Sequence, residues 1–183
     1  MHELYHHTDS ARLPWILRDQ TLKPIRNHGR LPEPDFLWAT TDPMGDSTAT
    51  SSFGNDRAAY RDGNIAAVRF TLDEADFTPW TVARTLYPQW TPRHCAALED
   101  GVPPGQVARW RCRVEPLDAS RWLAVEYRTW RNPRWRPVPP DVLCIASDAP
   151  DVLRVRLDGV IFASRQEEKP GQPTRYAIWK AAL

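Results

Sequence analysis

Leu4-Tyr5-His6-His7-Thr8 is the first strand that the sequence predicts. Side chains alternate between the two faces of a strand, so His6 and Thr8 share one face and His7 points to the other. A second strand, Phe-Leu-Trp-Ala-Thr-Thr at residues 36–41, carries an aromatic ring and two hydroxyls and stops at an Asp-Pro pair. The order of these two segments along the chain carries more information than any one of their residues.

The connection between the two strands predicts a short helix. Leu13, Ile16 and Leu17 have the spacing of one helical face, and Pro14 is tolerated only near the first turn. Asp9 or Ser10 can accept hydrogen bonds from the free amides at the helix start. A second short strand is expected at residues 21–25, followed by a loop.

The rest of the chain predicts more short strands and few helices. Weak helical patterns lie at residues 56–60, 82–86 and 93–98. Apolar and alternating runs predict strands at residues 65–72, 110–115, 122–130, 142–146, 159–163 and 176–180. The total is seven to nine short strands with two or three helices, an α+β pattern without a repeat or a domain linker. We therefore expect one domain over residues 1–183.

Proline and tryptophan are unusually frequent. The chain has 18 prolines and 9 tryptophans but only 8 glycines. Proline fixes φ and lacks an amide hydrogen, so this density excludes long helices and favours short strands with rigid connections. Tryptophan rings can supply the core area that short elements would otherwise lack.

Overall charge and cysteine content narrow the class of protein. The 24 basic and 23 acidic residues nearly cancel, which gives no indication of a surface for wrapping nucleic acid or adhering to a membrane. Cys95, Cys112 and Cys144 fit neither a disulfide framework nor a four-thiolate zinc site. No leader-like or membrane-spanning segment is present. We expect a soluble protein of a reducing cytoplasm, without a membrane partner.

Several common chemistries lack their motifs. The sequence has no phosphate-binding glycine loop, dinucleotide fingerprint or helical zinc motif, so no metal is expected. His6 and His7 point to opposite faces and cannot jointly hold one ion in the usual way. Ser164 lacks the sharp, glycine-flanked turn of a serine nucleophile, and no cysteine has a nucleophile signature.

The N-terminal segments resemble the opening of the ADP-ribosyltransferase superfamily, including its poly-ADP-ribose polymerase-like branch. That branch has a His-Gly-Ser or His-Gly-Thr strand, a helix ending near an Ile-Leu pair, and a strand with a Tyr-Phe-Ala core. Residues 5–8, Ile16-Leu17, Leu22 and residues 37–40 follow the same order. The polar segment 51–60 and the strand at 65–72 continue it, so the resemblance covers about the first seventy residues, while residues 73–105 have no counterpart.

The resemblance implies a fold, a cofactor and a set of site residues. The fold is an ADP-ribosyltransferase-like split of two small, mainly antiparallel sheets with NAD in the cleft between them. His6 matches the family histidine, Thr8 the following hydroxyl and Trp38 the aromatic position. The family glutamate often precedes a tyrosine, so Glu126 before Tyr127 is the best match and Glu115 the second choice. His7 replaces a small residue and Trp38 a tyrosine, which are departures from the family pattern.

The chemistry of NAD gives each residue type a reason. Cleavage of the nicotinamide–ribose bond develops positive charge on the sugar, which the catalytic carboxylate of Glu126 would stabilise. His6 would assist catalysis and, with Thr8, hold ribose hydroxyls or the carboxamide. Trp38 would support the nicotinamide by stacking. Thr40 and Thr41 would line the same groove.

Structural readings of the same residues stay open. His6 and Trp38 are ordinary strand residues that can be buried for stability alone, and Glu126 can face solvent or pair with an arginine. Arg69 can meet a phosphate or be a solvated arginine. The arginine- and tryptophan-rich run from 121 to 136 can form structural stacks or receive a nucleic-acid or acidic target.

The function expected from the resemblance is transfer of ADP-ribose from NAD to a macromolecule, protein or nucleic acid, or hydrolysis of NAD. A bacterial toxin or effector role, with an antitoxin or immunity partner, would follow from the same resemblance. RNA 2′-phosphotransferase chemistry uses the same cofactor and is one alternative. A catalytically inactive binding module of the same fold is the alternative from another class.

Overall fold

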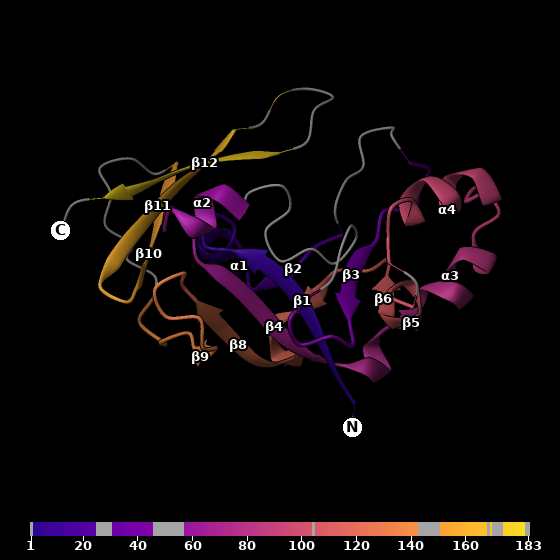
Figure 1. Cartoon of the computed structure of the whole chain (residues 1–183), viewed down its shortest axis with the longest axis horizontal. Helices are drawn as coiled ribbons and strands as arrows, with labels where there is room; N and C mark the ends of the chain where they lie inside the picture. The colour runs from indigo at the N-terminus through magenta and orange to yellow at the C-terminus, as the bar shows by residue number, and fades with distance from the viewer. Residues whose placement is uncertain are drawn as a thin grey trace.

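A computed structural model describes residues 2–24, 31–45, 57–103, 105–142, 151–167, 169 and 174–181. The described chain is a mixed α+β structure of antiparallel sheets and short helices (Figure 1). None of the described helices is long and apolar enough to cross a membrane. In chain order the strands and α-helices are β1 (Glu3–Asp9), α1 (Leu13–Asp19), β2 (Thr21–Leu22), β3 (Leu37–Thr40), α2 (Arg57–Arg61), β4 (Ala67–Asp73), β5 (Thr78–Pro79), α3 (Trp80–Leu86), α4 (Pro92–Glu99), β6 (Trp110–Arg113), β7 (Leu117–Asp118), β8 (Trp122–Arg128), β9 (Arg136–Pro137), β10 (Val152–Leu157), β11 (Val160–Glu167) and β12 (Arg175–Ala181).

Strand β1 occupies the centre of the largest sheet. This sheet has seven strands in the order β5-β6-β3-β1-β4-β8-β9, and β1 pairs antiparallel with both β3 and β4. Paired residues of an antiparallel ladder point to the same face. The first face of the sheet therefore carries Leu4, His6 and Thr8 of β1, and the second face carries Tyr5 and His7.

A three-stranded sheet, β10-β11-β12, and a two-residue ribbon, β2-β7, complete the described sheets. Together with α1 they cover the first face of the large sheet, because their apolar side chains share one core with it. The fully buried members of this core are Leu4, Leu13, Leu37, Ala39, Ala66, Val68, Phe70, Leu72, Val155 and Leu157. Helix α1 is short because Pro14 lies in its first turn and Gln20, at φ 52°, turns left-handed after it.

An aromatic cluster covers the second face over β3 and β6. Trp38 and Trp110 project from the sheet with ring centroids 5.9 Å apart. Trp80 from α3 packs on Trp38 at 5.1 Å, and Trp90 from the α3–α4 connection packs on Trp80 at 5.2 Å. Phe36 contacts three of the rings and Tyr87 in tilted or edge-to-face geometry. The tryptophans thus supply the core under helices that are only seven and eight residues long.

A third, small cluster lies at the other end of the second face. Tyr60 of α2 packs with Ile65 and Ala67, and Trp135 and Ile178 adjoin them. The cluster connects the short helix α2 to the β8–β9 connection and to strand β12.

The structure confirms most of the expected elements and corrects some bounds. The strands at 4–8, 36–41, 65–72, 110–115 and 122–130 are present as β1, β3, β4, β6 and β8. The second strand is only two residues long, and Ile25 lies outside the described residues. The expected strand at 142–146 also lies outside them, apart from Val142. Strand β10 was not expected, and the described chain holds four α-helices and twelve strands in three sheets rather than two.

Helix α3 offers a test of the aromatic cluster. Trp80→Ala removes a fully buried ring and a 2.7 Å hydrogen bond from its Nε1 to Glu99, so we expect a loss of about 3–5 kcal/mol of unfolding free energy in urea titrations. Val82→Ala on the same helix is the matched control, since its side chain is 47% exposed, and should change stability by less than about 0.5 kcal/mol. Equal effects of the two substitutions would contradict this description of the core.

Candidate functional site

His6 is held by the neighbouring strand. Its Nδ1 lies 2.7 Å from the backbone carbonyl of Trp38 on β3. A carbonyl only accepts, so Nδ1 carries the proton and the neutral ring presents Nε2 as an acceptor. Burial lowers the pKa of His6, and the charge of Arg12 lowers it further, while the hydrogen bond that His6 donates to the Trp38 carbonyl opposes both; the ring is therefore neutral at pH 7. Within the described chain Nε2 has no hydrogen-bond partner.

The polar residues that follow on β1 have different roles. Thr8 shares the first face with His6, and its hydroxyl bonds to none of the described residues. Asp9 accepts hydrogen bonds from the amides of Ala11 and Arg12 at 2.9 and 3.2 Å and so supports the entry into α1. Ser10 Oγ accepts from the amide of Ala66 at 2.9 Å. Among these described residues only Thr8 has a hydroxyl without a hydrogen-bond partner, and its side chain is buried.

Strand β3 places its three expected groove residues in different environments. Trp38 is 6% exposed, and its ring is enclosed by the aromatic cluster on the second face. Thr40 is fully buried, and its hydroxyl accepts from the amide of Asp42 at 3.1 Å. Thr41 is exposed just after the strand. The structure does not bring Trp38 to a surface where a nicotinamide ring could stack on it.

Glu126 lies on the second face of the sheet, whereas His6 lies on the first face. Cross-strand partners form one row of His7, Arg69 and Glu126 across β1, β4 and β8, while His6 is in register with Phe70. Glu126 Oε2 accepts from Arg69 Nε at 2.7 Å, and both side chains are largely buried. The structure therefore joins Glu126 to Arg69 and separates it from His6 by the thickness of the sheet.

Arg69 is the centre of an aromatic stack. Its guanidinium carbon lies 4.9 Å from the ring centroid of Tyr5 and 4.5 Å from that of Trp135, and Nη1 donates to the carbonyl of Pro43 at 2.7 Å. Such cation–π contacts and charge-assisted bonds hold the guanidinium in one position. A phosphate-binding role for Arg69 would have to displace Glu126 from this position.

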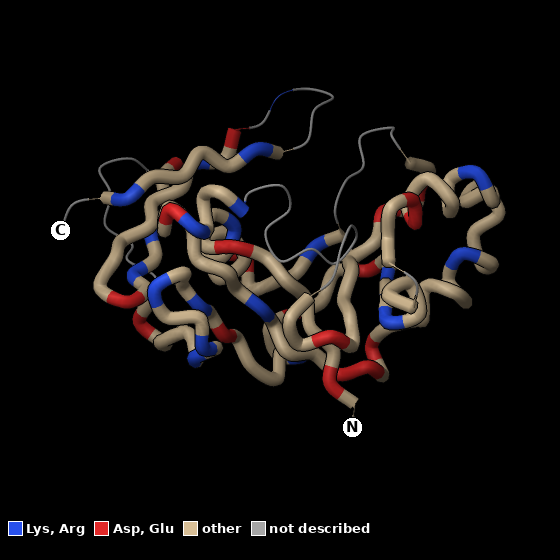
Figure 2. The backbone as a smooth tube through the Cα atoms, viewed as in Figure 1, with Lys and Arg blue, Asp and Glu red and all other residues tan. Residues whose placement is uncertain are grey.

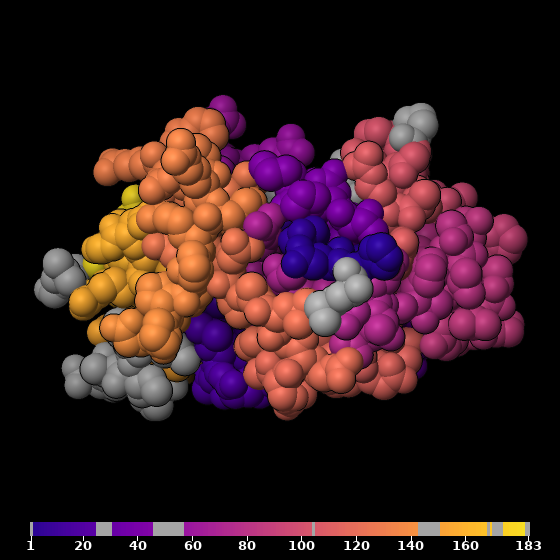
Figure 3. Space-filling model, turned by 90° about the horizontal axis from the view of Figure 1, so that it is seen from below, coloured from indigo at the N-terminus to yellow at the C-terminus, as the bar shows by residue number. Residues whose placement is uncertain are grey.

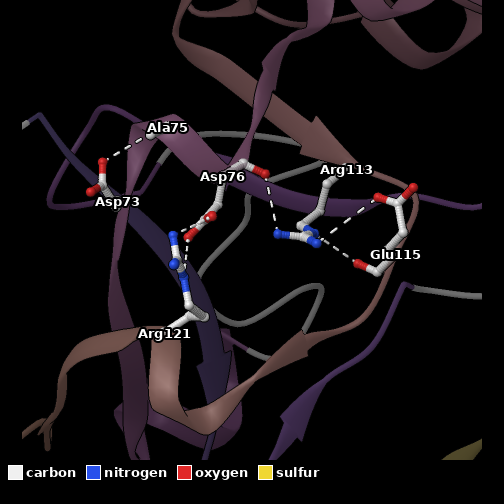
Figure 4. Close-up of polar contacts among 6 residues, drawn as sticks. All are labelled: Asp73, Ala75, Asp76, Arg113, Glu115 and Arg121. Atoms are coloured by element: carbon white, nitrogen blue, oxygen red, sulfur yellow. Dashed lines mark hydrogen bonds and ion pairs between the residues drawn. The ribbon is translucent and has the colours of Figure 1, made fainter.

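Glu115, the second candidate carboxylate, follows β6 and is 69% exposed. Its nearest cationic group is Arg113 Nη2 at 3.9 Å (Figure 4). Arg113 also donates to the backbone carbonyl of Asp76 at 3.2 Å, and the Asp76 carboxylate accepts two hydrogen bonds from Arg121. This network holds the end of β6 while the Glu115 carboxylate stays in solvent.

His7, to which the family resemblance assigns no role, lies buried on the second face of the sheet. It is 7% exposed, Nε2 lies 3.4 Å from the carbonyl of Asp42, and Nδ1 has no hydrogen-bond partner within the described chain. Gly45, at φ +77°, lies so close that an added Cβ would stand 3.1 Å from the ring. The alternation of β1 was the one sequence signal that separated His7 from His6.

The remaining reactive groups are buried or dispersed. Among the described residues no group of three or more His, Cys, Asp or Glu side chains could hold a metal ion. Cys95 and Cys112 are buried free thiols, and burial raises the pKa of Cys112 to about 12. Cys144 lies outside the described residues. These thiols do not form a nucleophilic centre.

Comparisons with known proteins add no relative: no family model, no curated protein and no solved structure matches this chain.

The pKa of His7 predicts a pH-dependent stability. Burial is the largest cause that lowers this pKa to about 4, and Arg69 and Arg128 contribute repulsion. Between pH 6.5 and 4 the unfolded chain binds a proton that folded His7 rejects, so unfolding free energy should fall by about 3 kcal/mol as the pH falls through this window.

Urea titrations at several pH values would measure this loss. His7→Gln should be less sensitive to pH over the same window, because the substituted side chain does not titrate. An identical pH dependence in the two proteins would show that His7 is not the group responsible.

Proposed function

We propose that this chain is an NAD-dependent enzyme resembling the ADP-ribosyltransferases, which transfers ADP-ribose to a macromolecular acceptor. The observation that carries the proposal is the bond between His6 Nδ1 and the Trp38 carbonyl. It fixes an uncharged ring on the central strand with Nε2 as a hydrogen-bond acceptor. A ribose hydroxyl is a ligand that such a nitrogen can orient.

Thr8 supports the same assignment. It lies two residues from His6 on the same face, about 7 Å further along the strand, a separation that a ribose and the carboxamide of the nicotinamide bonded to it can span. Its hydroxyl can both donate and accept. The polar groups of His6 and Thr8 suit NAD by chemistry, although at 9% and 6% exposure they are about as buried as the ring of Trp38, which does not fit as a stacking platform.

The catalytic carboxylate needs a revised assignment. NAD, when bound, would supply ADP-ribose, and a carboxylate near the ribose stabilises the positive charge that develops there. Glu126 is neutralised by Arg69 and faces away from His6. Glu115 is exposed and only loosely associated with Arg113. We propose Glu115 for the catalytic role only because it is the exposed carboxylate of the two, and keep Glu126 as the tested alternative.

The second candidate function is a catalytically inactive binding module. The Arg69–Glu126 ion pair and the burial of Trp38 favour it, because both remove groups that NAD cleavage would use. A toxin or effector role with an antitoxin partner depends on activity and therefore applies only to the enzyme.

Release of nicotinamide from NAD labelled in its nicotinamide ring would test the enzyme. We expect release by the purified chain, a loss of about 10²–10³-fold in Glu115→Gln, and weaker NAD binding in His6→Gln. Glu126→Gln tests the alternative carboxylate, and His94→Gln on α4 is the matched control for the histidine. Thermal unfolding of each variant would verify that it is folded.

The outcomes separate the candidates. Loss of release in Glu126→Gln with normal release in Glu115→Gln would return the catalytic role to Glu126. Absence of release together with absence of a thermal shift by NAD would contradict the enzyme and leave the binding module.

A further inference from the structure

The β8–β9 connection is the most basic part of the chain. Residues 127–136, Tyr-Arg-Thr-Trp-Arg-Asn-Pro-Arg-Trp-Arg, contain four arginines and three aromatic residues but no acidic residue. Residues 121–183 carry eleven basic and seven acidic side chains, a net charge of +4, whereas residues 1–120 carry −3. The chain as a whole is nearly neutral, but its charge is unevenly distributed: the part before residue 121 is acidic and the part after it is basic. Basic segments lie along this connection (Figure 2).

Two of the four arginines have structural roles. Arg128 lies over the ring of Trp135 at 4.6 Å, and Arg136 lies over Tyr127 at 4.6 Å while it forms an ion pair with Asp158. These stacks attach the base of the connection to β8. They leave Arg131 and Arg134, which are exposed and have no ion-pair partner within the described chain.

Trp130 is presented next to these free guanidinium groups. Its side chain is 55% exposed, and it meets Tyr60 of α2 edge-on, with ring centroids 5.8 Å apart and planes at 87°. The turn that carries it is closed, since the amide of Thr129 donates to the carbonyl of Asn132 and the amide of Asn132 donates to Thr129 Oγ1, both at 3.1 Å. The ring is therefore exposed in a held orientation.

From this arrangement we infer that the β8–β9 connection binds single-stranded nucleic acid. A base stacks on Trp130, and Arg131 and Arg134 contact the adjoining phosphates. An acidic protein would need the arginines but not the exposed indole, and a duplex would keep its bases stacked away from that ring. The connection belongs to the broad orange surface in Figure 3, so a chain of nucleotides can approach it from solvent.

The inferred surface gives the proposed enzyme an acceptor class. If ADP-ribose transfer occurs, the acceptor is single-stranded nucleic acid, and this part of the inference rests on the proposed function. Binding itself does not require NAD.

Fluorescence anisotropy with a labelled single-stranded oligonucleotide of mixed sequence, without NAD, would test the surface over a series of NaCl concentrations. We expect Trp130→Ala to weaken binding by about 5- to 150-fold. Arg131→Gln and Arg134→Gln should each reduce the slope of log K against log salt by about 0.7. The matched controls, Trp179→Ala on β12 and Arg93→Gln on α4, alter exposed residues outside the connection and should bind as the unaltered chain does.

Four results would overturn the inference: absence of binding, equal losses in the test and control variants, tighter binding of duplex than of single strands, or equal affinity for polyglutamate. The last would identify an acidic protein as the partner. Because the assay contains no NAD, its failure would not affect nicotinamide release, and absence of release would not affect oligonucleotide binding.

Discussion

Strand β1 hydrogen-bonds to β3 on one side and β4 on the other, and this double pairing sets the direction of every side chain in the middle of the molecule. His6 is consequently placed in the core under α1 and the three-stranded sheet, and His7 against the turn that follows β3. A register shift of one residue would exchange the two histidines and expose the apolar row that begins with Leu4. The candidate chemistry of the first face depends on this register.

Sequence composition determined how the second face is covered. With so many prolines the chain forms short helices, which bury little area by themselves. The indole rings of Trp38, Trp80, Trp90 and Trp110 occupy the space between sheet and helices, and their edge-to-face contacts produce a rigid cluster. Trp38, which the sequence offered as a platform for nicotinamide, is thus explained by packing in this cluster.

The sequence was sufficient for the strands whose pattern is local. Alternation located β1, β6 and β8, and helical spacing with an early proline located α1. It did not specify which strands pair, and pairing decides which residues share a face. Glu126 therefore matched a family position in order along the chain yet lies across the sheet from His6. The two-residue strands β5, β7 and β9 are too short to produce a pattern, and they exist because longer neighbours offer free backbone groups.

The turn at residues 41–45 contacts side chains of two strands, β1 and β4, and the segment just before β6. The carbonyl of Asp42 contacts His7, and the carbonyl of Pro43 accepts a hydrogen bond from Arg69. The Asp42 carboxylate pairs with Arg109, and Gly45 leaves little room for a Cβ beside the His7 ring. A displacement of this turn would break contacts with β1, with β4 and with the segment just before β6. A substitution at Gly45 would therefore act at a distance, through a misplaced imidazole and a loosened Arg69–Glu126 pair.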